Sequence, residues 1–137
     1  MTIGIGIDAV EIAKCVEWIA SRERLKRIFS DSEIAYCFSV EKCIAQRLAA
    51  RFAVREAFFK ALHSAKLSFD IPFLTLCKQI EVKQVIGSAP ILVAHWDQIL
   101  TKGSDANPLQ TRLSITHTSQ VAIAYVMLVD LVSELPD

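Results

Sequence analysis

The sequence predicts an α+β domain in which one long helix packs on a small, mainly antiparallel sheet, with short additional helices. Residues 40–64 contain no proline or glycine and carry apolar side chains near helical spacing, which favours one uninterrupted helix. Residues 3–10 alternate large apolar residues with small or polar ones, which is typical of a strand. Short apolar runs separated by turn residues fill the last third of the chain and indicate paired strands.

The N-terminal elements follow in a clear order. The first strand is expected over residues 3–10, ending near Glu11. Residues 13–29 form a basic, partly amphipathic helical region. Ser30 is followed three residues later by Glu33, which matches a capping box and predicts the start of a short helix before the long one.

The second half of the chain is expected to be mainly strand. Residues 79–85 and 91–94 are two apolar runs joined by a turn at 87–90, which predicts a hairpin. The remaining elements are expected to be a short helix over 95–102, a polar loop over 103–108, and two last strands over 113–116 and 121–129.

Length and composition limit the class of protein. The chain has 137 residues and is expected to form a single domain over 1–137, since one core commonly holds about 100 to 150 residues. The formal net charge is zero, which argues against nucleic acid or an anionic membrane as a partner. The four cysteines show no CxxC spacing and no signal-like segment opens the chain, so a cytoplasmic location is expected. The longest apolar stretch is far shorter than the roughly 20 residues of a membrane-spanning helix.

Charged residues on the long helix form a first candidate site. Glu56, Lys60 and His63 follow at i, i+4 and i+7 and therefore share one face. A neighbouring row that also advances by four residues holds three guanidinium groups suited to phosphate: Arg47, Arg51 and Arg55. An ordinary solvated helix shows the same spacing, so this pattern alone leaves both interpretations open.

Asp8 adds a carboxylate at the end of an apolar strand that also contains Gly4 and Gly6, which permit close backbone approach. Together with Glu56 it would form an oxygen-rich half-shell of the kind that magnesium prefers, completed by water and phosphates. The alternative is that Asp8 only caps a helix or a turn. The histidines and cysteines lack the ligand spacing of a zinc site.

Three segments carry motifs in a fixed order: GIGID at residues 4–8, RFAVREAFFKAL at 51–62 and SITHT at 114–118. In their order and spacing they resemble the short, bacterial-type 4'-phosphopantetheinyl transferases of the holo-(acyl carrier protein) synthase family. The resemblance covers nearly the whole chain and implies the fold of that family. It also implies magnesium-dependent transfer of 4'-phosphopantetheine from coenzyme A to a serine of apo acyl carrier protein, in fatty-acid biosynthesis, with release of adenosine 3',5'-bisphosphate.

The resemblance further implies roles for individual residues. Asp8 and Glu56 would bind Mg²⁺ with the coenzyme A diphosphate, and Lys60 would complete the catalytic trio by offsetting charge on the leaving diphosphate. The group that accepts the serine proton stays open. The residues that contact coenzyme A would be Arg51, Arg55, Lys60, His63, Gly87, Pro90 and His117.

Partner proteins are also implied by the resemblance. In the family a basic first helix docks the acidic recognition helix of the carrier protein, and trimers form with active sites between subunits. The docking residues here would be Lys14, Trp18, Arg22, Arg24 and Leu25. An ordinary charged surface helix would show the same residues. A homotrimer is expected from the resemblance alone.

The chain departs from the family pattern at two places near the predicted site. Arg55 stands where the family usually has lysine, and residues 63–66 read HSAK where glycines are common. These departures motivate the alternative of a catalytically weak module that binds coenzyme A or carrier protein without transfer. A nucleic-acid binder that uses the arginine row is a third hypothesis, which the zero net charge disfavours.

Overall fold

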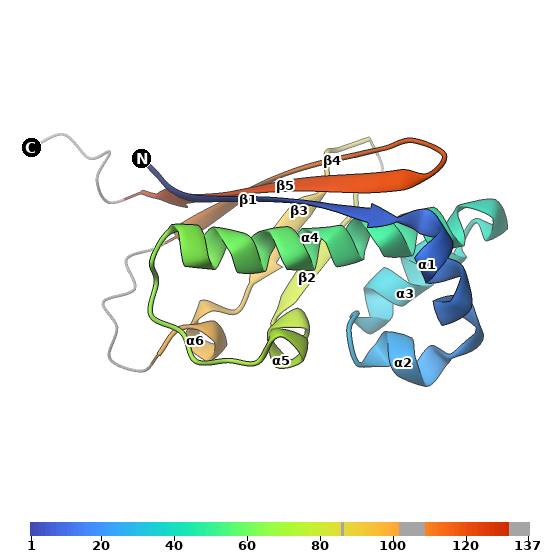
Figure 1. The fold of residues 1–137 in the computed structure, drawn as a ribbon, viewed down its shortest axis with the longest axis horizontal. Coiled ribbons are helices and arrows are strands. Elements are labelled where there is room, and N and C mark those ends of the chain that lie inside the picture. Colours follow the sequence, from blue (N-terminus) through green and yellow to red (C-terminus); the bar gives the residue numbers. More distant parts are fainter. Residues whose placement is uncertain (86, 102–108, 132–137) are drawn as a thin grey trace, which may run out of the picture.

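The structure is a computed structural model that describes residues 1–85, 87–101 and 109–131 (Figure 1). Its elements, in chain order, are β1 (Thr2–Glu11), α1 (Ile12–Val16), the 3₁₀ helix η1 (Glu17–Ala20), α2 (Arg22–Lys26), α3 (Asp31–Phe38), the 3₁₀ helix η2 (Glu41–Cys43), α4 (Ile44–Ser64), α5 (Phe73–Cys77), β2 (Ile80–Lys83), β3 (Ile91–Ala94), α6 (Trp96–Ile99), β4 (Leu109–His117) and β5 (Val121–Asp130). The polar loop expected over 103–108 lies outside the described residues.

A three-stranded antiparallel sheet and a separate hairpin frame the long helix. The sheet has the order β1-β5-β4, and β2 pairs with β3 in the hairpin. Figure 1 shows α4 running beneath β1 and β5, with α1, α2 and α3 gathered near one end of it. The Thr111 hydroxyl donates to the Leu92 carbonyl at 2.6 Å and so joins β4 to the hairpin. The predicted architecture, one long helix on a small antiparallel sheet, is confirmed.

Two glycines allow β1 to lie directly on α4. A Cβ added at Gly4 would lie 2.5 Å from the Ala61 carbonyl oxygen, and one added at Gly6 would overlap the carbonyl of Ala57. No other side chain fits there, because real Cβ contacts are longer than this. The close approach predicted from the sequence is confirmed, and it brings the end of β1 against the middle of α4.

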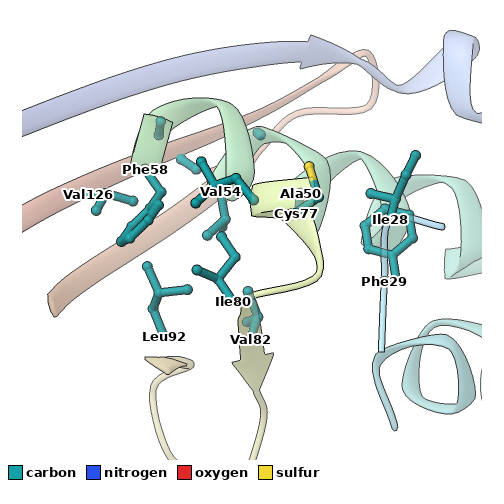
Figure 2. Packing of buried hydrophobic residues seen from close by; sticks show 14 of the residues in the cluster. Ile28, Phe29, Ala50, Val54, Phe58, Cys77, Ile80, Val82, Leu92 and Val126 are labelled. Carbon is teal, nitrogen blue, oxygen red and sulfur yellow. The ribbon is translucent and has the colours of Figure 1, made fainter. Parts of the chain in front are cut away.

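The main core lies on the other side of α4. Figure 2 shows Val54 and Phe58 of the helix directed toward Ile80 and Leu92 of the hairpin, with Val126 of β5 alongside. These side chains are at most 4% exposed. The helix is therefore covered on two sides, by small residues against β1 and by large residues against the hairpin, and its position is fixed by both.

The N-terminal helical region differs from the prediction of one segment over 13–29. It is broken into α1, η1 and α2, because Ser21 adopts an extended conformation and its hydroxyl accepts from the Arg24 amide at 3.3 Å as the N-cap of α2. The capping box predicted at Ser30 and Glu33 is confirmed, since each side chain accepts from the other's amide, at 3.2 and 3.1 Å.

Smaller differences concern element boundaries. The long helix begins at Ile44 because residues 41–43 form η2, and the short helix α5 after Pro72 was not predicted. Strand β4 is longer than the predicted 113–116, because it pairs with β5 over its whole length. Among the described residues, no helix has the length and apolarity to cross a bilayer.

Candidate active site

Asp8, Glu56 and Lys60 meet where β1 lies on α4. The Lys60 ammonium donates to Asp8 Oδ1 at 3.1 Å and to the Ile7 carbonyl at 3.0 Å. Asp8 and Glu56 line one pocket of about 280 Å³. The structure thus brings together a strand residue and two residues of a helix more than 40 positions later, as the sequence analysis expected.

The two carboxylates repel each other at this pocket. Burial raises the pKa of Glu56, and the nearby charge of Asp8 raises it further, while Lys60 lowers it. The Lys60 side chain is 54% exposed, so its ion pair with Asp8 is screened by water and contributes little to stability. The site consequently holds negative charge that is only partly compensated.

This charge suits a divalent cation. Asp8 and Glu56 offer two carboxylates at this pocket, and the described residues contain no group of three or more histidine, cysteine or acidic side chains that could hold a metal. Magnesium is commonly bound by one or two carboxylates and keeps its other positions for water and substrate phosphates. The donor set therefore fits magnesium bound jointly by protein and a phosphate ligand, and it does not fit a closed structural metal site.

The rest of this pocket includes residues that the sequence analysis did not assign to the site. Glu11, Phe52 and Trp18 line it together with Asp8 and Glu56, and Trp18 packs edge-on against Phe52 with ring centroids 5.0 Å apart. Strand alternation places residues i and i+3 on opposite faces, so Glu11 was not expected beside Asp8. It borders the pocket as the last residue of β1, immediately before α1.

Arg55 requires a correction. It was expected to contact coenzyme A phosphates, but its side chain is 0% exposed and forms a two-pronged ion pair with Glu33, at 2.6 and 2.9 Å. Its other N–H groups donate to the carbonyls of Ile28, Cys77, Arg51 and Ile80. All five N–H donors are thus used inside the protein, and Arg55 fastens α3 and β2 to α4.

Arg51 lies beside this ion pair, at the edge of the core. It is 4% exposed, its guanidinium lies over the Tyr36 ring at 4.3 Å, and its Nε has no hydrogen-bond partner among the described residues. Arg47 stacks on the same ring at 4.1 Å. Tyr36 also lines a second pocket of about 270 Å³, formed with α3 and the end of the hairpin's first strand, residues 82–85.

The other residues expected to contact coenzyme A lie at separate places. His63 is exposed at the end of α4 and packs edge-on against Phe59 and Phe69, and His117 is exposed at the end of β4. Gly87 and Pro90 belong to the connection between β2 and β3, where Gly87 has a φ of 81°. The Asp8 pocket includes none of these four among its described lining residues.

The predicted docking residues lie in three different places. Lys14 and Trp18 line the Asp8 pocket, and Arg22 and Arg24 are exposed on α2, with the Arg22 guanidinium 3.6 Å from the centre of the Phe38 ring. Leu25 was expected on the docking surface, but this prediction is wrong, because its side chain is 0% exposed. The break at residue 21 turns α2 so that Leu25 points into the core, where it cannot contact a partner.

Comparison with known proteins identifies the family. Residues 4–125 match the 4'-phosphopantetheinyl transferase superfamily, in its ACPS branch. The chain belongs to this superfamily. It is 34% identical over 131 residues to the holo-[acyl-carrier-protein] synthase of Treponema pallidum strain Nichols, covering 93% of this chain and 96% of the relative. It is 30% identical over 128 residues to the Treponema denticola protein of the same name, covering 93% and 98%.

Solved structures agree with this assignment to the holo-[acyl-carrier-protein] synthase family of phosphopantetheinyl transferases. The Bacillus anthracis synthase in complex with CoA (3',5'-ADP) has a TM-score of 0.70 and 26% identity, with coverage of 95% of this chain and 98% of that one. The Helicobacter pylori synthase in complex with coenzyme A has a TM-score of 0.67 and 26% identity, with coverage of 91% and 99%. The chain is an enzyme of this transferase family.

Proposed function

We propose that this chain transfers the 4'-phosphopantetheine group of coenzyme A to a serine of apo acyl carrier protein and releases adenosine 3',5'-bisphosphate. The observation that carries the proposal is that Asp8 and Glu56 line one pocket between β1 and α4, while Lys60 donates a hydrogen bond to Asp8. The synthases named with bound coenzyme A support the donor, and the names of the Treponema relatives support the acceptor. The reaction would serve fatty-acid biosynthesis in the cytoplasm.

Asp8 and Glu56 are the residues that would hold Mg²⁺. Their mutual repulsion, which contributes to the raised pKa of Glu56, is relieved when a cation lies between them. Bound there with the coenzyme A diphosphate, the metal would supply electrophilic polarisation of the phosphoryl oxygens.

Lys60 serves the same site in two ways. Its hydrogen bond to Asp8 Oδ1 holds the carboxylate in place, and its side chain remains 54% exposed and so open to a ligand. An ammonium one helical turn from Glu56 would offset the negative charge that grows on the leaving diphosphate. Phe52 and Trp18 give the pocket an apolar wall that limits the access of water to the reacting phosphate.

The far end of coenzyme A would occupy the second pocket. Tyr36, which lines this pocket, carries the guanidinium of Arg51 on its ring and so brings positive charge near it, and Gly87 and Pro90 lie in the connection that follows its residues 82–85. His117 and His63 are exposed and would add contacts from outside the two pockets. Arg55 is excluded from this set because its donors are already used.

The carrier protein would dock on the helices that follow β1. Lys14 on α1 and Arg22 and Arg24 on α2 present positive charge, and Val16 on α1 is an apolar side chain that is 57% exposed. A mixed basic and apolar surface suits an acidic, amphipathic helix of the carrier. Docking at this place would bring the acceptor serine to the pocket that Lys14 and Trp18 line.

Assembly into a homotrimer is part of the same proposal. The face of the sheet opposite α4 is apolar and exposed at Ile5 and Ile7, which are 50% and 57% accessible. An apolar sheet face of this kind favours association with further copies of the chain. The number of three comes from the family resemblance.

The test is a mass measurement on apo acyl carrier protein incubated with the chain, coenzyme A and Mg²⁺. We expect the carrier to gain one phosphopantetheine group, and we expect Asp8→Ala and Glu56→Ala each to lower the rate at least about 100-fold. Circular dichroism of both variants should match the parent protein, because neither side chain is part of the core. Full activity in either variant would remove the metal assignment, and no gain of mass with Mg²⁺ or Mn²⁺ would refute the function.

The alternative of a binding module without transfer rested on two departures from the family pattern, and the departure at Arg55 no longer supports it. The exchange of lysine for Arg55 alters a buried ion pair and leaves the described lining of the Asp8 pocket unchanged. Coenzyme A binding with no turnover in the same mass assay would favour this alternative.

A further inference from the structure

Glu11 occupies an unusual position for a residue with no assigned role. It is the last residue of β1, its side chain is exposed, and it lines the pocket that contains Asp8 and Glu56. It also lines a larger neighbouring pocket of about 520 Å³, formed by the start of α1 and by Ser119, Gln120 and Val121 at the turn into β5. This acidic residue therefore borders both the proposed metal site and the open hollow next to it.

The Glu11 side chain has no structural task in the described part of the chain. It stands at the N-cap of α1 but makes no side-chain hydrogen bond to that helix. No hydrogen bond or ion pair joins it to another described residue. A glutamate at a helix N-cap that does not cap is free to interact with a ligand or a partner.

Glu11 is also separate from the metal carboxylates. Within the described residues it does not combine with Asp8 and Glu56 into a group of three that could hold a metal. Asp8 is a charge that raises the pKa of Glu56, whereas Glu11 is not among the groups that perturb it. Glu11 thus lines the same pocket without forming a three-carboxylate cluster with Asp8 and Glu56.

Chemistry requires a proton acceptor at such a place. A carboxylate that binds a cation is a weak base, because its lone pairs are already engaged, and Asp8 in addition accepts a hydrogen bond from Lys60. The acceptor serine belongs to another protein and must arrive from the open side of the pocket. Lys14, which lines the same pocket three residues after Glu11, belongs to the surface on which the carrier would dock.

We propose that Glu11 is the general base that takes the proton from the acceptor serine, an inference that depends on the proposed function above. The serine Oγ forms a bond to the phosphorus of the phosphopantetheine phosphate. The bond from that phosphorus to adenosine 3',5'-bisphosphate breaks, and its electron pair leaves with the bisphosphate. The proton passes from Oγ to the Glu11 carboxylate, so atoms and charge balance without a further reactant.

The test compares Glu11→Gln with the parent chain in the carrier-protein assay. The substitution preserves size and polarity but removes the proton acceptor. We expect kcat to fall about 10²- to 10³-fold, which is the usual contribution of a general base. Calorimetric binding of coenzyme A with Mg²⁺, in the absence of carrier, should change by less than about twofold, because the metal carboxylates and Lys60 are untouched.

Two further variants make the result specific. Glu11→Asp keeps a carboxylate at a shorter reach and should recover part of kcat, which a purely spatial role would not predict. Glu17→Gln removes the same charge from η1, where Glu17 is exposed and lines neither pocket among the described residues, and should keep the parent kcat at saturating carrier.

A kcat for Glu11→Gln within about threefold of the parent would overturn the proposal. A loss of coenzyme A affinity equal to the loss of rate would also overturn it, since Glu11 would then act in binding. Absence of turnover in the parent chain would instead refute the proposed function itself, and the parallel assay separates that outcome from the others.

Discussion

At the scale of single residues, burial decides what each charged side chain does. Glu56 and Arg55 are neighbours in sequence, yet one lines the pocket and the other is enclosed in the core. Their partners differ accordingly. Glu56 faces a second carboxylate across an accessible site, while Arg55 faces the carboxylate of Glu33 with neither side chain exposed.

The Glu33–Arg55 pair predicts a large stability effect. Glu33→Gln leaves the arginine charge buried without its counter-ion, and we expect it to lower the free energy of unfolding by about 3–5 kcal/mol. Urea unfolding at a fixed protein concentration measures this. The double variant Glu33→Leu/Arg55→Met removes both charges and should cost less than Glu33→Gln alone. A loss below about 1 kcal/mol for Glu33→Gln would show that water relieves the buried charge.

Glu56 predicts a dependence of stability on pH in metal-free protein. The pKa of Glu56 is higher in the folded protein than in the unfolded chain. The stabilisation that comes from protonated Glu56 is therefore fully present below the unfolded pKa, and it is lost as pH rises through the folded pKa. We therefore expect Glu56→Gln to raise the urea midpoint at about pH 7 and to differ little from the parent at about pH 4. Glu17→Gln, at an exposed position, is the matched control. A lower midpoint for Glu56→Gln at neutral pH would contradict the sign.

At the scale of elements, the end of α4 explains the second departure from the family pattern. Lys66 has a φ of 57°, its amide donates to the His63 carbonyl at 3.1 Å, and the Leu67 amide donates to the Leu62 carbonyl at 3.3 Å. This is a Schellman helix end, which usually places glycine at the left-handed position. Here Lys66 adopts the left-handed conformation, which is strained for a residue with a Cβ.

The left-handed lysine predicts a stabilising substitution. Lys66→Gly should raise the free energy of unfolding by about 1 kcal/mol, because glycine adopts a positive φ without the steric cost of a Cβ. Ala65→Gly, one residue earlier at a right-handed helical conformation, is the control and should instead lower it by about 0.5–1 kcal/mol. Thermal and urea unfolding both report the difference. A destabilising Lys66→Gly would mean that the lysine side chain has contacts that outweigh its backbone strain.

At the scale of the whole molecule, the two faces of the sheet differ in their contacts. One face is buried by α4 through the alternate residues Ala122, Ala124, Val126 and Leu128 of β5. On the other face, Ile5 pairs with Met127 and Ile7 with Tyr125, and these side chains are only partly covered or exposed. In a monomer these apolar side chains stay in contact with water, whereas association of several copies would remove their apolar surface from water.

This outer face predicts a change of assembly state. Ile5→Lys places a charge among the apolar side chains and should convert the proposed trimer to monomers in sedimentation velocity. Leu74→Lys is the matched control, because Leu74 is 60% exposed on α5, away from the sheet, and its replacement should leave the assembly unchanged. A parent chain that sediments as a monomer would refute the trimer, and so would an Ile5→Lys variant that stays trimeric.

The sequence alone determined the fold class and the family, and it predicted the proposed catalytic trio of Asp8, Glu56 and Lys60, because each depends on signals that can be read along the chain. An uninterrupted helical pattern, a glycine-bearing strand that ends in Asp8, and the spacing of Glu56 and Lys60 can all be recognised without coordinates. Only the tertiary structure decided that Arg55 and Leu25 are internal and that Glu11 lines the pocket. Those outcomes depend on where β1 ends and α1 begins, on how Ser21 breaks the helical region, and on which side of α4 meets Glu33. Packing between segments that are distant in sequence determines these positions, and the spacing of residues along the chain does not predict that packing.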